Sequence, residues 1–268
     1  MESNSICLSI IGGGVMAEAI LSRLLAQNVF AANTVLVSEP RAERREYLAE
    51  QYGVRVTQDN QTAVSAAEII LLAVKPQIFK VVTDNIEPNG SSTVISILAG
   101  TTIALLETAF PQQPVIRVMP NTPATVGQGM TAIAPGSKAT EKHLEQARSI
   151  FNAVGEVVEV SESAMDAVTG LSGSGPAFVA LAIEALADGG VASGLPRAIA
   201  LQLATQTVLG TATLVRETGQ HPGVLKDRVT SPGGTTIAGV AKLESLGFRS
   251  ALIEAVKTAT KRSQELGE

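Results

Sequence analysis

Short apolar runs rich in Val and Ile alternate with longer amphipathic segments from the start of the chain to about Val160. This alternation is typical of βαβ units, in which helices cover a parallel sheet. We therefore predict six strands, at Ile6–Ile11, Thr34–Ser38, Ile69–Val74, Thr93–Ile97, Val115–Val118 and Met130–Ala134.

The pattern changes near Val160–Ser163, because from Met165 onward only helical stretches separated by Gly, Ser and Pro remain. The fold class predicted is α/β, with a parallel-sheet domain over residues 1–162 and an all-helical domain over residues 163–268. Within the helical part, Ala177–Leu186 and Ala198–Val215 are apolar nearly all round. A helix of this kind must be buried on every side, so we predict an intimate homodimer that covers both segments.

Composition limits the classes of function. Hydrophobic residues make up 45% of the 268 residues and charged residues 17%, which indicates a folded chain. Aromatic residues are only 3% and the net charge is −5, so we expect no nucleic-acid partner. With two histidines and Cys7 as the sole cysteine, neither an internal disulfide nor a metal site is expected.

The expected location is the cytoplasm. A single cysteine suits a reducing compartment, and no apolar run is judged long enough to span a membrane. The first residues, 1–5, are acidic rather than basic, so we expect no signal peptide.

A glycine-rich segment, Gly12-Gly13-Gly14-Val15-Met16-Ala17, directly follows the first predicted strand and opens a helix. In a dinucleotide-binding turn, the first glycine allows the tight turn and the second lets the backbone approach a pyrophosphate. We assign Gly12, Gly14, Val15 and Met16 to a dinucleotide site of the Rossmann type. The alternative is a tight strand-to-helix turn with no ligand.

The end of the second strand bears on cofactor choice. Ser38 occupies the place where an NAD site usually has a carboxylate, and Arg41 follows shortly. A hydroxyl and a guanidinium suit the 2′-phosphate of NADP, although Glu39 would repel it unless it points to solvent. We predict a preference for NADPH, with NADH also accepted. The alternative is that Arg41, Arg44 and Arg45 form an ordinary solvated helix face.

Further motifs are more specific than a dinucleotide domain requires. They are Ala73-Val74-Lys75-Pro76, Arg117–Ala124, Asp166–Ala177, Glu184–Gly190, His221–Asp227 and Ser231–Gly239. Together they resemble the pyrroline-5-carboxylate reductase family over essentially the whole chain, and Ser231-Pro232-Gly233-Gly234-Thr235-Thr236 is highly specific.

The resemblance implies a six-phosphogluconate-dehydrogenase-like architecture, in which a Rossmann domain precedes a helical domain that interleaves with its twin. It also implies NAD(P)H-dependent reduction of 1-pyrroline-5-carboxylate to L-proline, the last step of proline biosynthesis. The oligomer implied is a homodimer or a larger ring of dimers. Asn60 matches the asparagine near the adenosine ribose. Val15 departs from the family, where a polar or basic residue is common, which puts one diphosphate contact in doubt.

Three groups of residues are expected at the carboxyl edge of the sheet, where ligands of doubly wound folds bind. We assign to the cofactor site Ala73, Val74, Lys75, Pro76, Ala99, Met119, Pro120 and Asn121. For Lys75, contact with the cofactor and simple capping of the sheet by charge are equally favoured.

The Ser231–Thr236 stretch has the chemistry to bind a small carboxylate, because its glycines expose N–H groups and a helix follows. We assign substrate binding to Ser231, Gly233, Gly234, Thr235 and Thr236. The family pattern makes Thr236 the catalytic residue, facing the ring nitrogen. The alternative is a plain N-cap loop. A cyclic imine can be protonated before hydride arrives, and we read His143 as a surface residue and His221 as structural.

Two other functions are weighed. A hydroxyacid dehydrogenase of the same architecture would need a lysine in the helical domain, where Lys226 is the only mid-domain candidate before Lys242. A nucleotide-sensing regulatory protein without catalysis would not need the Gly-Gly-Thr-Thr anion pocket.

Overall fold

The computed structural model describes residues 5–267. The expectation of no signal peptide depends on residues 1–4, which lie outside this range. The chain divides into two compact units, which are described separately. Unit 1 comprises Met1–Gly173 and Ala259–Glu268, and unit 2 comprises Ser174–Thr258.

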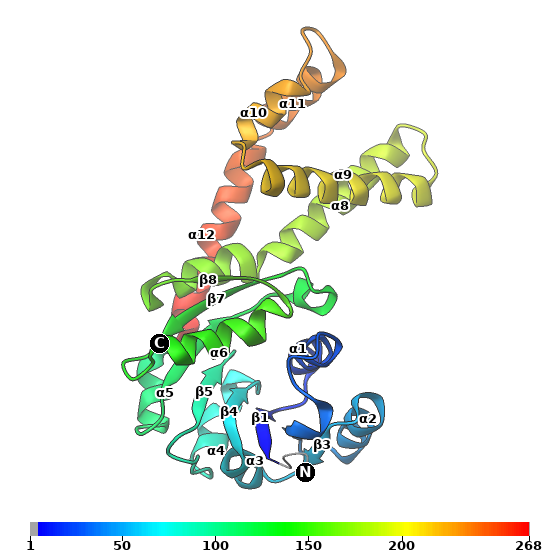
Figure 1. Ribbon diagram of the computed structural model, residues 1–268. Coiled ribbons are helices and arrows are strands. Elements are labelled where there is room, and N and C mark those ends of the chain that lie inside the picture. Colours follow the sequence, from blue (N-terminus) through cyan, green and yellow to red (C-terminus); the bar gives the residue numbers. More distant parts are fainter. Residues whose placement is uncertain (1–4, 268) are drawn as a thin grey trace. The chain divides into compact units, whose positions relative to one another are not determined.

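Unit 1 is built on an eight-stranded sheet (Figure 1) in the order β3-β2-β1-β4-β5-β6-β7-β8. All neighbouring strands run parallel except β6 and β7. The strands are β1 Ile6–Ile11, β2 Val35–Ser38, β3 Arg55–Thr57, β4 Ala67–Leu72, β5 Thr93–Ser96, β6 Val115–Met119, β7 Gly129–Pro135 and β8 Gly155–Glu159. This is the α/β class that the sequence predicts.

Each predicted strand is present, but two further strands were missed. These are β3 and β8, the two edges of the sheet. Their residues include Arg55, Glu156 and Glu159, and most are not buried. Charge on an edge strand discourages pairing with other chains, and it also hides the strand from an analysis based on apolar runs.

Helices cover both faces of the sheet. They are α1 Val15–Ala26, α2 Ala42–Tyr52, α3 Asn60–Ala66, α4 Phe79–Thr83, α5 Ile103–Ala109, α6 Glu141–Asn152 and α7 Met165–Val168. Short 3-10 segments occur at η1 Ala32–Thr34, η2 Pro76–Ile78, η3 Thr122–Val126 and η4 Glu162–Ala164, and η5 Thr169–Gly173 is a π-helix.

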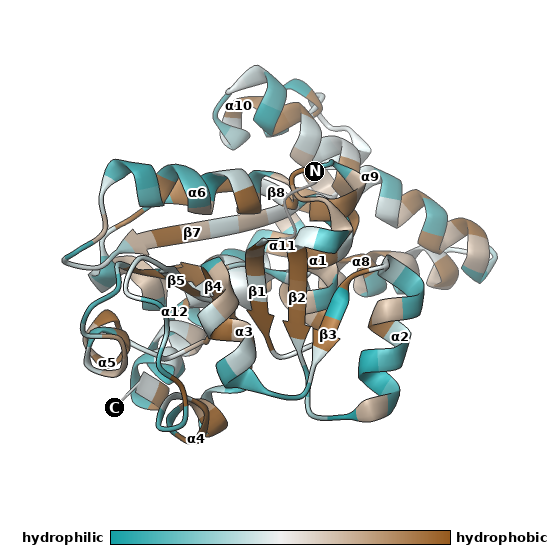
Figure 2. Cartoon of the chain, turned by 60° about the horizontal axis from the view of Figure 1, so that its bottom comes forward, coloured by the Kyte–Doolittle hydropathy of each residue, from teal (hydrophilic) through white to brown (hydrophobic). Residues whose placement is uncertain are grey.

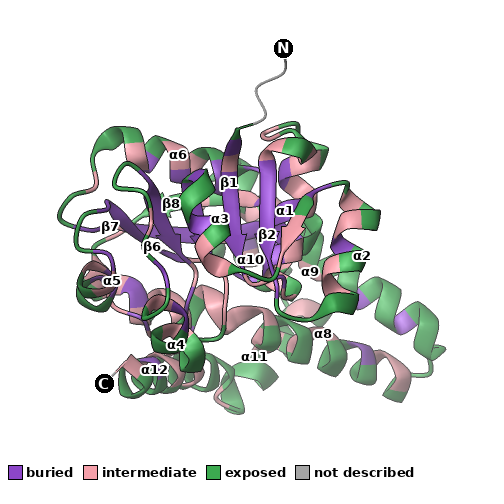
Figure 3. Cartoon of the chain, turned by 90° about the horizontal axis from the view of Figure 1, so that it is seen from below, coloured by how far each residue is buried: buried purple, intermediate pink, exposed green. Residues whose placement is uncertain are grey.

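Alternate residues of the central strands point into two separate cores. In β4, Ile69 and Leu71 join the core beneath α1 and α6, whereas Ile70 and Leu72 join the core on the other face. Burial on both faces explains why these strands are apolar over most of their length. Figures 2 and 3 show the result, since β1 and β2 are both hydrophobic and buried.

Unit 2 is entirely helical within the described residues. Its helices are α8 Gly175–Ala192, α9 Arg197–Thr218, α10 Pro222–Arg228, α11 Thr235–Ser245 and α12 Phe248–Gly267, whose last turns belong to unit 1. Its buried cluster consists only of Ala187, Ala200 and Ala204, where α8 meets α9. Large apolar side chains such as Leu181 and Leu203 are 66% and 54% exposed, and Figure 3 shows α9 mostly exposed.

The units divide after Gly173, whereas the sequence places the domain boundary at residue 162. The difference has a physical cause, because the segment in between packs within unit 1. Met165 is fully buried in the second core. The Ser263 hydroxyl, near the end of α12, donates a 2.7 Å hydrogen bond to the Asp166 carboxylate.

Two segments of the described chain, Glu162–Ala192 and Arg197–Thr218, are long and apolar enough to cross a membrane by length and composition. The judgement that no run reaches that length is therefore wrong for these two. Such segments are weak evidence of a membrane protein, since core helices of other proteins pass the same test. In the most apolar 18-residue stretch of each segment, only 6% and 11% of the residues are buried.

Candidate functional site

The first glycine turn, Gly12–Gly14, joins β1 to α1 at the carboxyl ends of the strands. The Gly12 N–H donates a 2.8 Å hydrogen bond to the Ser38 carbonyl of β2. Gly12 has φ +99°, and a Cβ there would lie 2.8 Å from the Ala73 carbonyl oxygen beyond β4. Only glycine fits this position, as the sequence predicts for the first motif glycine.

Gly14 caps the N-terminus of α1 in an extended conformation, and no side chain caps the helix. Nothing lies within 4 Å of a Cβ built on Gly14, and Val15 is 79% exposed. The N–H groups of the first helical turn have no partner within the helix. An open, uncapped N-terminus fits a pyrophosphate, with Met16 in the same first turn.

The Gly13 peptide is held on both sides. Its N–H donates to Glu39 Oε2 at 3.0 Å, and its carbonyl accepts from Arg44 Nε at 2.7 Å. Arg45 donates through one terminal nitrogen to the Glu39 and Pro40 carbonyls, at 2.8 Å each. Arg44 and Arg45 are therefore not an ordinary solvated helix face, because Arg44 holds the turn and Arg45 holds the backbone that follows β2.

Arg44 is itself fixed by Glu18 of α1, whose carboxylate also accepts hydrogen bonds from Tyr47 and Tyr52. Burial alone would raise the pKa of Glu18, but these hydrogen bonds and the Arg44 charge outweigh it and lower the pKa. Burial and the same carboxylate raise the pKa of the Tyr52 hydroxyl. The cluster thus keeps a charged Glu18 that ties α2 to α1.

The end of β2 presents three predicted cofactor residues. Ser38 is 1% exposed, and its hydroxyl donates a 2.6 Å hydrogen bond to Asn60 Oδ1 at the start of α3. Arg41, by contrast, has a side chain that is 71% exposed. The structure therefore brings Ser38 and Asn60 together and leaves Arg41 as the accessible positive charge.

Glu39 does not point to solvent, contrary to the condition set from the sequence. It is 5% exposed and lies between the first glycine turn and Arg41, whose Nε donates to its carboxylate at 2.9 Å. Burial would raise the pKa of Glu39, but hydrogen bonds from Arg41 and Gly13 outweigh burial and lower it. The carboxylate is thus charged but paired with a cation.

The predicted wall of the cofactor site follows the carboxyl ends of β4, β5 and β6. A Cβ on Gly12 would lie 3.0 Å from Val74 Cγ1, so Ala73 and Val74 border the turn directly. Lys75, Pro76 and Ala99 are exposed. Neither role considered for Lys75 is thereby excluded.

The Met119-Pro120-Asn121 segment after β6 is largely engaged within unit 1. The Asn121 side chain donates to the Ser172 carbonyl at 3.0 Å and accepts from the Met130 N–H at 2.8 Å. Pro120 is buried, and Met119 Cε would lie 2.8 Å from a Cβ on Gly173. Asn121 therefore holds β7 and the π-helix in place.

The second glycine turn, Ser231–Thr236, lies in unit 2 and begins α11. The Gly234 N–H donates to the Ser231 carbonyl at 3.1 Å, and Gly233 has φ +66°. Proline at the second position and a left-handed glycine at the third are typical of a type II turn. Gly234 is the N-cap, and no side chain caps the helix.

None of the hydroxyls in the second glycine turn has a hydrogen-bond partner among the described residues. Ser231 and Thr235 are exposed, and Thr236 is half-buried. A plain N-cap loop would use one of these hydroxyls as the cap. The cap is Gly234 instead, so none of these hydroxyls is used to cap α11.

The two histidines have local structural contacts. His221 is the N-cap of α10, and its Nδ1 accepts from the Gly223 N–H at 3.1 Å. His143 is half-buried and forms a capping box with Thr140 at the start of α6, so it is more than a surface residue. Burial, with help from Lys142, lowers the pKa of His143.

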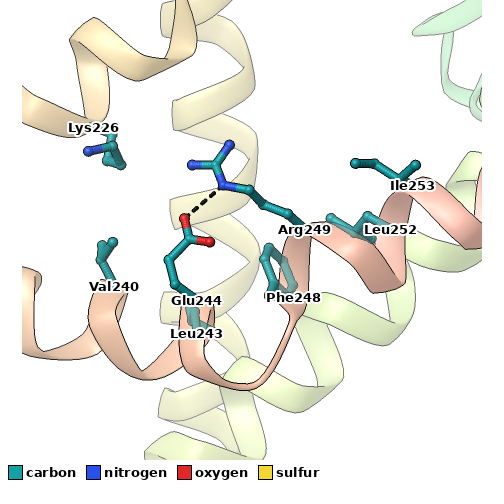
Figure 4. Close-up of a pocket in the computed structure, with 8 residues that line it drawn as sticks. All are labelled: Lys226, Val240, Leu243, Glu244, Phe248, Arg249, Leu252 and Ile253. Carbon is teal, nitrogen blue, oxygen red and sulfur yellow. Dashed lines mark hydrogen bonds and ion pairs between the residues drawn. The ribbon is translucent and has the colours of Figure 1, made fainter.

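Lys226 lines a groove of about 440 Å³ between α10, α11 and the start of α12 (Figure 4). The groove is otherwise mostly apolar and also contains Glu244 and Arg249, which pair at 2.7 Å. Lys226 pairs with Asp227, its neighbour in the chain. This pairing gives no support to Lys226 as the proton-handling lysine of a hydroxyacid dehydrogenase.

Comparisons with known proteins identify the two halves of the chain separately. Residues 162–266 match the family model described as pyrroline-5-carboxylate reductase dimerisation, and residues 7–100 match an NADP oxidoreductase family described as coenzyme F420-dependent. The first match supports the predicted homo-oligomer, and the second supports a cofactor site of the NADP type.

Three proteins show how far the similarity extends. A pyrroline-5-carboxylate reductase of Synechocystis sp. is 60% identical over 265 residues, covering 98% of this chain and 99% of the relative. A Coxiella burnetii pyrroline-5-carboxylate reductase structure has a TM-score of 0.91 at 36% identity, covering 99% of this chain and all of that one.

A Plasmodium falciparum pyrroline carboxylate reductase structure with NADP bound has a TM-score of 0.89 at 32% identity, and 98% of each chain is covered. The family, the fold class and the reductase function predicted from the sequence are confirmed. The chain belongs to the pyrroline-5-carboxylate reductase family.

Proposed function

We propose that this chain reduces the C=N bond of 1-pyrroline-5-carboxylate to give L-proline, with Thr236 as the residue that faces the reacting ring. The observation that supports this assignment is the second glycine turn, whose uncapped helix and unengaged hydroxyls form a neutral anion site. A bound nicotinamide cofactor supplies the hydride.

Different residues of the second glycine turn bind different parts of the substrate. The N–H groups that begin α11 and the hydroxyls of Ser231 and Thr235 bind the substrate carboxylate, with Gly233 and Gly234 keeping the backbone accessible. The Thr236 hydroxyl donates to the ring nitrogen. Because the imine is protonated easily, positioning rather than a strong acid accounts for most of the catalysis.

The cofactor residues support a preference for NADPH over NADH. Arg41 is the exposed cation at the end of β2, and Asn60 keeps its amide nitrogen available beside Ser38. The diphosphate binds at Gly14, Val15 and Met16, where α1 is uncapped. The 2′-phosphate of NADPH then binds the free edge of the Arg41 guanidinium.

The expected assembly is a homodimer or a ring of dimers, acting in the cytoplasm without a membrane partner. The exposed apolar side chains of α8 and α9 support association, because a second copy of this chain would cover them.

The test is an assay of NADPH absorbance with purified protein after addition of 1-pyrroline-5-carboxylate. We expect rapid loss of absorbance, and no formation of NADPH from NADP⁺ with a 2-hydroxy acid. Oxidation of the hydroxy acid alone would favour the dehydrogenase alternative. Binding of NADPH with no turnover of either substrate would favour the regulatory alternative.

A further inference from the structure

We propose that Glu39 is a positioning residue that joins the two phosphate-binding positions of the cofactor site and thereby sets the preference for NADPH. The inference rests on the proposed function, in which Arg41 binds the 2′-phosphate and the first glycine turn binds the diphosphate. Glu39 contacts both positions, with one carboxylate oxygen directed to each.

The contacts are specific to each oxygen. Oε2 accepts from the Gly13 N–H at 3.0 Å. Oε1 accepts from Arg41 Nε at 2.9 Å and from the Arg41 N–H at 3.2 Å. One buried side chain therefore fixes the backbone of the turn and the orientation of the guanidinium together.

Only a carboxylate satisfies both partners, because each of them is a donor. An ionised carboxylate accepts through two oxygens, whereas an amide has one accepting oxygen and one NH₂ group. Glutamine at this position would direct its NH₂ at either Gly13 or Arg41, so one donor would face another donor. The charge of Glu39 is thus needed for the arrangement, and its lowered pKa shows that the fold favours the ionised form.

Because Arg41 Nε donates to Glu39, the terminal nitrogens of Arg41 are the atoms left to bind a ligand. A guanidinium is a rigid planar group, so anchoring Nε fixes the direction of the terminal nitrogens. These remain accessible, because the Arg41 side chain is 71% exposed while that of Glu39 is 7% exposed. The phosphate therefore meets a preoriented cation and not the carboxylate.

The surroundings also hold the backbone of Glu39 beside the first glycine turn. Its N–H donates to the Thr57 carbonyl of β3 at 3.0 Å, and its carbonyl accepts from Arg45 at 2.8 Å. A Cβ on Gly13 would lie 3.3 Å from Glu39 Cβ, so the side chain packs directly against the turn.

The experiment measures dissociation constants of NADPH and NADH by fluorescence titration for Glu39→Gln, Arg41→Ala and the double variant. Glu39→Gln should weaken NADPH roughly tenfold more than NADH, since a charge-assisted contact is lost. In the Arg41→Ala background, the same substitution should leave the NADPH/NADH ratio unchanged. Glu43→Gln removes the same charge from an exposed residue of α2 and should change neither constant.

The outcomes separate the two proposals. An unchanged ratio in Arg41→Ala would overturn the proposed 2′-phosphate site and this inference with it. A changed ratio in Arg41→Ala with none in Glu39→Gln would overturn the inference alone. Tighter NADPH binding in Glu39→Gln would also overturn it, because Glu39 would then be repelling the phosphate.

Glu39→Asp provides a second variant if the glutamine variant does not fold. It keeps the charge but is one methylene shorter, so it cannot reach both partners. We expect a partial loss of the NADPH preference, measured as the ratio of the two dissociation constants. A full wild-type preference would overturn the inference.

Discussion

The two glycine turns begin their helices in nearly the same backbone geometry. Gly14 has φ −72° and ψ −177°, and Gly234 has φ −79° and ψ 176°, with no side-chain cap at either helix. Their surroundings differ. The first turn is held by Glu39 and Arg44 of its own unit, whereas no described side chain binds the hydroxyls of the second.

This difference separates a site that one chain completes from one that it leaves open. The first glycine turn is held within unit 1 by hydrogen bonds from side chains of that unit. The second turn belongs to a unit whose apolar helices are exposed and whose sequence matches a dimerisation family. We therefore expect perturbations of unit 2 to act through assembly and those of unit 1 through the fold.

The largest effect is expected from Leu203→Glu on α9. Leu203 is 54% exposed in one chain, and a charge buried in a dimer seam would lack a partner at a cost of several kcal/mol. The protein should dissociate or misfold, and activity should fall more than about a hundredfold. Light scattering and the NADPH assay measure both effects.

Leu105→Glu is the matched control, because Leu105 lies on α5 of unit 1 and is 50% exposed. It should leave the oligomer and the activity close to wild type. A folded, fully active Leu203→Glu monomer would contradict the expected dependence on assembly.

Gly12→Ala should damage the first turn itself. A Cβ would lie 2.8 Å from the Ala73 carbonyl, at φ +99°, so we expect a loss of roughly 2–5 kcal/mol in unfolding free energy. Gly14→Ala meets no atom within 4 Å and should cost less than about 1 kcal/mol. The Cβ added by Gly14→Ala should nevertheless weaken cofactor binding, because the diphosphate is expected to approach the backbone there. Titration with NADPH measures this effect. Equal stability of the two variants would show that the turn is not tightly packed.

Much of this fold is predictable because the central strands are buried on both faces and are therefore mostly apolar. The same reasoning misses β3 and β8, whose charged residues are suited to sheet edges. A tertiary contact such as Ser263 with Asp166, near the end of α12, also leaves no local pattern in the sequence.

The candidate site shows the same limit. Glycine spacing predicts the two turns, since a left-handed φ or a close backbone approach demands glycine. The support from Glu39 and Arg44 was not predicted, because charged residues at a helix start normally suggest a solvated face. The sequence did contain a signal for this support. One carboxylate, Glu39, and three arginines, at positions 41, 44 and 45, follow within a few residues of the strand end at Ser38.

A moderate effect is expected from Thr236→Ala in the second turn. Loss of one hydrogen bond to the reacting ring should cost about 1–3 kcal/mol, or roughly 10- to 100-fold in kcat/KM. Thermal stability should not change, because the hydroxyl has no partner within the described chain. Thr230→Ala is the control, since that hydroxyl donates to the Lys226 carbonyl at 2.6 Å and should affect stability but not the kinetics. Unchanged kinetics in a folded Thr236 variant would remove the catalytic assignment.

Ser38→Asp combined with Arg41→Ala should change the cofactor preference. The Michaelis constant for NADPH should rise about 10-fold or more, while that for NADH changes little, because only NADPH has the 2′-phosphate. The maximal rate should be nearly constant. Steady-state kinetics with each cofactor provide the comparison, and equal effects on both would mean that these residues support the strand end.

The smallest expected effect is on the pH dependence of stability, and it again distinguishes the two units. Burial alone would raise the pKa of Glu18, but hydrogen bonds from Arg44, Tyr52 and Tyr47 outweigh burial and lower this pKa below 4.5. A carboxyl whose folded pKa is depressed stabilises the protein above its unfolded pKa, and this stability disappears as the pH falls through the folded pKa. Glu18→Gln should therefore make thermal stability less dependent on pH during acidification, as measured by circular dichroism.

Glu254→Gln is the control, because it breaks an exposed pair with Lys257 in unit 2, and such pairs contribute little to stability. Its acid profile should match wild type, and equal flattening in both variants would remove the special role of the supported turn.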